Sequence, residues 1–204
     1  MCLWSEAQEN TYRFSKDILR SVHPDTTYFV HQVASWDFAA VGNYHMALAM
    51  HDSINNRYGT LAKGDSDYFY QFKTVNALTY IARRAASEKV IIINEAHNQP
   101  YHRVFTQLLL DSLYKAGYRY FGVETVGHGD TMLNQRKYPV IKSGPYMAQP
   151  QYGNLVRAAL QKGFYVFAYE TTNLSCTGKE REIDQAQNIK RILDKDTGAK
   201  ILIH

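Results

Sequence analysis

Val90-Ile91-Ile92-Ile93-Asn94-Glu95 is a run of four β-branched apolar residues followed closely by a carboxylate. Two later apolar runs also end on a glutamate, at Glu124 and Glu170, and a fourth run ends at His204. Short apolar runs separated by helical stretches are typical of parallel strands in βαβ units. Because the carboxyl ends of parallel strands share one edge of a sheet, ligand sites gather there. The sequence therefore predicts an α/β fold in which acidic and imidazole side chains meet at one rim.

The α/β part is expected to span residues 89–204 as a parallel-stranded βαβ sheet with covering helices. The expected strands are 89–94, 118–124, 164–169 and 199–203, and the helices between them are about 101–116, 151–162 and 180–195. Glycine commonly ends a helix, and each expected helix is followed by one: Gly117, Gly163 and Gly198. Asn98 suits the N-cap of the helix expected over about 101–116, and Pro100 suits its first turn.

Residues 1–88 are predicted to form a separate helical N-terminal region. The pattern of apolar residues indicates helices over about 6–21, 36–55 and 74–86. Gly59, Gly64 and Asp65 are expected to mark a break between them.

Segment 125–150 interrupts the alternation of strands and helices and is rich in glycine and proline. A loop this long in a compact domain is usually functional. Since it follows Glu124, we expect a substrate lid or pocket wall, with a plain surface insertion as the alternative. The 16 tyrosines favour amphipathic packing, or else a pocket lined by aromatic rings.

Composition excludes several classes of function. The net charge is +4, but lysine and arginine are scattered, so no nucleic-acid partner is expected. Two distant cysteines, Cys2 and Cys176, form neither a disulfide framework nor a zinc motif. No apolar run reaches the roughly 18 residues of a transmembrane segment. Residues 1–4 lack a signal-peptide pattern, although a trimmed leader leaves localisation undetermined, as is the oligomeric state.

Glu95 and His97 are the strongest candidates for catalysis. Histidine titrates near neutrality and suits general base work, and a neighbouring carboxylate can orient its ring. The same residues, with Glu124, are candidates for holding a metal ion through nitrogen and oxygen ligands. The alternative is that Glu95 and His97 belong to a polar loop with a capping role.

Further candidate site residues are identified by their positions at the ends of strands or on helices. Glu124 and Glu170 end strands, and their proximity would raise the pKa of at least one of them, unless each is held in a salt bridge to an arginine. Arg181 is expected to clamp an oxyanion or a carboxylate. The expected substrate-binding residues lie near helix starts or on one helix face: His102, Arg103, Gln185 and Asn188. Solvent exposure is the alternative for each of them.

Residues 89–204 resemble the erythromycin esterase-like group and its relatives, the ChaN-like and TraB/TIKI proteins. The resemblance is carried by Asn94-Glu95-Ala96-His97, His102, the strand ending Gly122-Val123-Glu124, and the helix with Arg181 and Gln185 to Asn188. Asn94 replaces the usual glycine of this pattern. Relatives tend to carry a second Gly-x-x-His motif just past the last strand, where this sequence ends. Because a domain rarely ends on a core strand, we expect part of this domain to lie beyond His204.

The resemblance implies an esterase-like hydrolase in which His97 activates water without a metal. In that scheme Glu95 or Glu124 orients His97, Glu170 assists proton transfer and Arg181 stabilises negative charge. TIKI-like members are metal-dependent proteases and ChaN-like members bind haem. A haem- or metal-binding protein and a catalytically silent relative, with the helical region as its interaction surface, therefore remain open beside a hydrolase acting on a small organic substrate.

Overall fold

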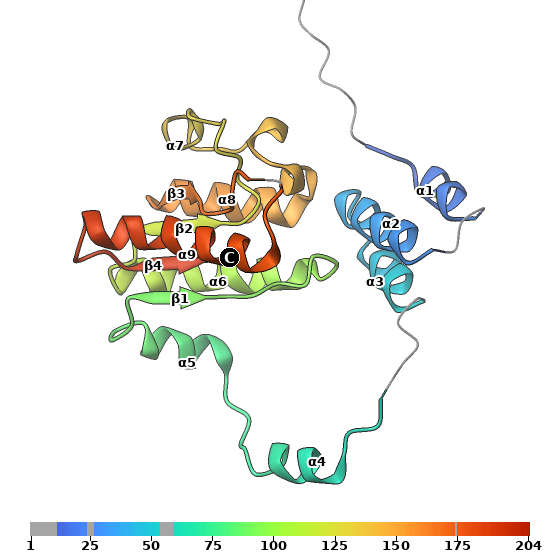
Figure 1. The fold of residues 1–204 in the computed structure, drawn as a ribbon, viewed down its shortest axis with the longest axis horizontal. Coiled ribbons are helices and arrows are strands. Elements are labelled where there is room, and N and C mark those ends of the chain that lie inside the picture. Colours follow the sequence, from blue (N-terminus) through green and yellow to red (C-terminus); the bar gives the residue numbers. More distant parts are fainter. Residues whose placement is uncertain (1–11, 24–26, 54–58, 174) are drawn as a thin grey trace, which may run out of the picture.

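The computed structural model describes residues 12–23, 27–53, 59–173 and 175–204, which form a mixed α/β fold (Figure 1). Within these residues one sheet contains four parallel strands in the order β1-β4-β2-β3. The strands are β1 (Val90–Ile92), β2 (Tyr120–Val123), β3 (Tyr165–Ala168) and β4 (Ile201–Ile203). The predicted fold class, a parallel sheet with covering helices after a helical N-terminal region, is confirmed.

The last strand lies in the middle of the sheet. Ile201 of β4 is the partner of Val90 on one side and of Tyr120 on the other. The ladder continues past the strands, where the Glu124 N–H donates to the His204 carbonyl over 3.0 Å. His204 therefore leaves the sheet between the strand that precedes Glu95 and the strand that precedes Glu124.

Helices cover both faces of the sheet. On one face α6 (Pro100–Lys115), α8 (Pro150–Lys162) and α5 (Ala77–Arg84) enclose the main core. On the other face α9 (Gly178–Lys195) packs against a smaller apolar cluster from β2, β3 and β4. Alternating strand side chains supply both cores, as a sheet buried on two faces requires.

Gly122 is required where β2 passes between its two neighbours. A Cβ atom there would lie 2.6 Å from Ile203 Cδ1 and 2.8 Å from Phe167 Cζ. Both side chains lean over the glycine, so the α9 face of the sheet is filled without a side chain from position 122.

The observed ends of the helices agree in part with those predicted from the sequence. Gly117 and Gly163 have φ of 95° and 105° after α6 and α8, as predicted. The expectation for Gly198 is wrong, because α9 ends at Lys195 and the Gly198 N–H instead donates to Asp196 Oδ1. Asn98 is not the cap of α6, since Gln99 occupies that position and Pro100 starts the helix.

The single helix expected over 36–55 is wrong. The chain forms α2 (Tyr28–Ala40) and α3 (Tyr44–Asp52), which pack together with α1 (Ser15–Val22). Gly42 adopts a φ of 78°, and Asn43 Oδ1 accepts the Met46 N–H as the cap of α3. A left-handed glycine followed by a capping asparagine ends one helix and begins the next.

The other N-terminal expectations are confirmed in part. Of the helix expected over 6–21, residues 6–11 lie outside the described residues, as does Cys2, and α1 begins at Ser15. Gly64 and Asp65 do not break the chain but lie inside α4 (Lys63–Phe69), which stands apart from the sheet in Figure 1. The helix expected over 74–86 is α5, capped by Asn76.

Segment 125–150 contains short helical elements and is not an irregular loop. It contains α7 (Leu133–Arg136) and two short 3₁₀ turns, η1 (Ile141–Ser143) and η2 (Pro145–Ala148). Asp130 pairs with Arg136 and accepts from Ser143, and Asn134 hydrogen-bonds the Val166 backbone in both directions. Several independent contacts therefore hold this segment beside the sheet rim.

Across the described ranges, no helix combines the length and the apolar character that crossing a membrane requires.

Candidate functional site

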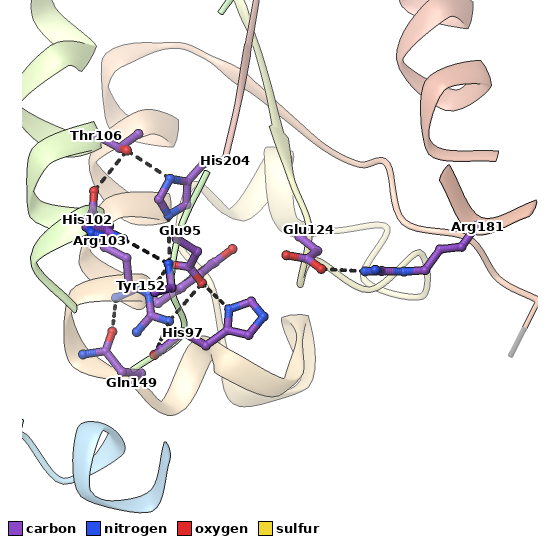
Figure 2. A network of polar contacts seen from close by, with 11 residues as sticks. Glu95, His97, His102, Arg103, Thr106, Glu124, Gln149, Tyr152, Arg181 and His204 are labelled. Carbon is purple, nitrogen blue, oxygen red and sulfur yellow. Dashed lines mark hydrogen bonds and ion pairs between the residues drawn. The ribbon is translucent and has the colours of Figure 1, made fainter. Parts of the chain in front are cut away.

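The Glu95 carboxylate is the centre of a buried polar group at the rim (Figure 2). Its side chain is 4% exposed and accepts four hydrogen bonds. His97 Nδ1 lies 2.7 Å from Oε1 and His204 Nε2 lies 3.2 Å from Oε2. Arg103 donates from Nε at 2.8 Å and from Nη2 at 3.0 Å. We call Glu95, His97, Arg103 and His204 the inner cluster.

These donors keep Glu95 ionised. Burial by itself raises the pKa of the Glu95 carboxyl, but hydrogen bonds from His204, His97 and Arg103 outweigh it and lower the pKa far below its ordinary value. With its oxygens occupied by donors, Glu95 is suited to positioning its neighbours rather than to accepting a proton itself.

His97 is held by one ring nitrogen. A carboxylate only accepts hydrogen bonds, so Nδ1 carries the proton that goes to Glu95, and Nε2 is the basic nitrogen of the neutral ring. The hydrogen bond to Glu95 raises the pKa of His97 above its ordinary value, with a smaller contribution from the charge of Glu124, against the opposing effect of burial. The side chain is 31% exposed, so it can meet a ligand.

His204 is a partner of Glu95 that the candidate residues did not include. Its fully buried ring also contacts Thr106 Oγ1 through Nδ1 at 3.0 Å. The sequence did place a histidine directly after the fourth strand. Its pairing with Glu95 follows only from the position of β4 beside β1.

Arg103 and His102 face different ways at the start of α6. The Arg103 side chain is 1% exposed, holds Glu95, and its guanidinium carbon lies 4.8 Å from the Tyr152 ring centroid. His102 Nδ1 accepts the Ala96 N–H at 3.0 Å and so folds the Glu95–His97 loop back onto the helix. Solvent exposure, the alternative for Arg103, is wrong.

A second group, which we call the rim cluster, consists of Glu124, Glu170 and Arg181. Arg181 pairs with Glu124 at 2.6 Å and with Glu170 through a fork of hydrogen bonds. The side chains of Glu124, Glu170 and Arg181 are 27%, 23% and 45% exposed, respectively. Figure 2 shows Glu124 between the inner cluster and Arg181. Of the two possibilities that the sequence left open for these glutamates, the structure contains the salt bridge to an arginine.

Gln185 and Asn188 share the α9 face of Arg181, as predicted. Gln185 Nε2 donates to Glu170 at 2.9 Å, whereas Asn188 Nδ2 donates to the Tyr169 carbonyl at 2.9 Å. Burial raises the pKa of Glu170, but Arg181, the Thr171 N–H and Gln185 together lower it below its ordinary value. The expectation of a raised pKa is therefore wrong for Glu170.

Two cavities border the clusters. The larger, about 310 Å³, is lined by His97 and Arg103, by Trp36 of α2 and by Tyr146 of η2, among others. The smaller, about 160 Å³, is lined by residues of both clusters, among them Glu95 and Glu124, and by Tyr169. No sequence motif marked Trp36, while Tyr146 belongs to the segment expected to form a pocket wall.

The arrangement does not suit a metal ion. Glu95 is saturated by donors and Glu124 is paired with Arg181, so two of the three candidate ligands are engaged. Among the described residues, no three His, Cys, Asp or Glu side chains are placed to hold an ion together. The larger cavity, about 310 Å³, is at the lower limit of the volumes of small-molecule pockets.

No family model, curated protein or solved structure matches the chain. The likeness to the erythromycin esterase-like group therefore stays a prediction from the sequence.

Proposed function

We propose that this protein is a hydrolase that cleaves esters with a water molecule activated by His97. The observation that carries the proposal is the 2.7 Å hydrogen bond from His97 Nδ1 to a buried carboxylate that two further residues hold in place. That contact fixes the ring and its tautomer, and it directs the basic nitrogen away from Glu95. A carboxylate-oriented imidazole beside a cavity is a recurrent device for general base catalysis.

The reaction proceeds in two steps. His97 Nε2 takes a proton from water while the water oxygen forms a bond to the ester carbonyl carbon, giving a tetrahedral intermediate. The intermediate then expels the alcohol as its carbon–oxygen bond breaks, and the His97 imidazolium returns the proton to the leaving oxygen. Glu95 stays ionised throughout and stabilises the imidazolium between the two steps.

Arg103 is the candidate to bind the carbonyl oxygen. Its Nε and Nη2 are engaged by Glu95 and by the His97 carbonyl, whereas none of the hydrogen bonds among the described residues uses Nη1. Arg103 also borders the larger cavity beside His97. An N–H group of a charged, preorganised guanidinium would stabilise negative charge as it develops on that oxygen.

We assign the rim cluster a role in supporting His97. Arg181 is neutralised by two carboxylates, which leaves it poorly suited to clamp a further anion. Glu170 is ionised and holds Arg181, so it is a weak proton donor. We propose that Arg181 positions Glu124, whose charge helps to raise the pKa of His97.

The test is hydrolysis of phenyl acetate, methyl benzoate and ethyl acetate by the wild-type chain and by His97→Ala. We expect His97→Ala to lower kcat/KM by about 10²- to 10⁴-fold, the usual contribution of a general base. His45→Ala, which removes an exposed histidine of α3, is the matched control and should keep full activity. Full turnover by His97→Ala, with an active wild type, would overturn the proposal.

A further inference from the structure

The larger cavity lies between the N-terminal helices and the α/β domain. Trp36 and Ala39 of α2 form one wall, while Pro145 and Tyr146 of η2 form the other. His97 closes one side of it. A group bound next to His97 must therefore fit between a helix of the N-terminal region and the wall segment that precedes α8.

Aromatic rings surround His97 in this cavity. The His97 ring centroid lies 5.0 Å from that of Tyr146 and 6.3 Å from that of Trp36. The Trp36 and Tyr146 rings are themselves 6.0 Å apart in an edge-to-face contact. Such rings pack best against other flat apolar groups, in offset or edge-to-face arrangements.

The charged groups that border the cavity are already paired. Asp37 is held by Arg13, and Arg103 is held by Glu95. Gln149, which also lines the cavity, donates to the Tyr44 hydroxyl and accepts the Tyr152 N–H. The cavity therefore presents balanced charge and mostly apolar surface, which disfavours a charged ligand because its desolvation would not be compensated.

We infer that this cavity selects an uncharged substrate with a planar aromatic group, and that Trp36 is the residue that determines this specificity. The inference rests on the proposed function for the ester that is cleaved, but the binding of a flat neutral ring does not need hydrolysis. A volume of about 310 Å³ is at the lower limit of ligand pockets and suits a single ring with a short ester.

The first experiment measures binding of acetophenone, a planar uncharged carbonyl compound that cannot be hydrolysed, by isothermal titration calorimetry. We expect Trp36→Ala to weaken binding by about tenfold, the upper range for an aromatic contact. Phe29→Ala, which removes an exposed aromatic side chain from the same helix, should bind like the wild type. Benzoate, which adds a charge to the same ring, should bind more weakly than acetophenone.

The second experiment compares kcat/KM for phenyl acetate and for ethyl acetate. Trp36→Ala should lower the value for phenyl acetate by about tenfold and leave ethyl acetate within about twofold. Trp36→Phe keeps a flat ring, so it should retain most of the preference and also shows that the effect is not a failure to fold.

The outcomes separate the two proposals. Equal losses for both esters in Trp36→Ala, or acetophenone binding that survives it, would overturn the role of Trp36 while leaving His97 as the base. A preference lost as fully in Trp36→Phe as in Trp36→Ala would overturn recognition of a flat ring. Acetophenone binding that depends on Trp36, without hydrolysis of any ester, would retain the aromatic site and reject the hydrolase.

Discussion

The inner cluster and the rim cluster each contain an arginine paired with at least one carboxylate, yet they differ in burial. The Arg103 and Glu95 side chains are 1% and 4% exposed, whereas those of Arg181, Glu124 and Glu170 are 45%, 27% and 23% exposed. Water screens the charges of the rim cluster more strongly than the protein interior screens those of the inner cluster. The arginine–carboxylate pairs of the two clusters therefore differ in energy and are suited to different tasks.

The difference shows why only one of the two clusters can hold an imidazole ring in a fixed orientation. Burying a carboxylate that lacks hydrogen-bond donors costs much free energy, so Glu95 must keep its partners. This requirement holds the His97 ring in a single orientation. Glu124 and Glu170 can exchange Arg181 for water at little cost. The rim cluster is thus adaptable, and the inner cluster is rigid.

The largest expected effect is the difference in stability between the two arginine variants. Arg103→Ala leaves Glu95 buried and without its main partner, so the free energy of unfolding should fall by about 3–5 kcal/mol. Arg181→Ala removes a partly exposed ion pair and should cost about 1 kcal/mol or less. Urea unfolding followed by circular dichroism measures both, and equal losses would show that burial does not separate the clusters.

The next effect concerns the pH dependence of hydrolysis. His97 must be neutral to act as a base, so kcat/KM should rise with pH as the ring loses its proton. Because Glu95 raises the pKa of His97, the midpoint of this rise should lie above about 6.5, the ordinary pKa of histidine. In Glu95→Gln the imidazolium loses its anionic partner, so the midpoint should move to lower pH. The plateau should fall by about 10²-fold or more, because the ring is no longer held in one tautomer.

Glu88→Gln is the control for this profile, since Glu88 lies before β1, at the end of that strand remote from the inner cluster. A midpoint that stays in place or moves to higher pH in Glu95→Gln would show that Glu95 does not set the basicity of His97.

The smallest effect is expected at the outer part of the rim. Asn188→Ala removes an amide that donates to the Tyr169 carbonyl, so the free energy of unfolding should fall by about 1 kcal/mol. The KM for phenyl acetate should stay within about twofold of the wild type, as for surface changes such as Lys179→Ala. A clear rise in KM would instead place Asn188 against the substrate, as the sequence alone suggested.

Much of the α/β domain could be predicted because local patterns and tertiary structure agree there. The apolar runs before Glu95, Glu124 and Glu170 became strands, and Gly117 and Gly163 ended helices, since each signal depends on a few neighbouring residues. The N-terminal region was less predictable. Gly42 in a left-handed conformation divides what the apolar pattern alone suggests is one helix.

The sequence by itself determined that Glu95, Glu124, Glu170 and His204 would stand at one edge of a parallel sheet, because side chains that follow parallel strands share that edge. Only the tertiary structure decided how they pair. The insertion of β4 beside β1 brings His204 to Glu95, and the packing of α9 gives Arg181 to Glu124 and Glu170. The docking of α2 sets Trp36 beside His97, across 61 positions of the chain (97 − 36). Such contacts join residues distant in sequence, and no local pattern encodes them.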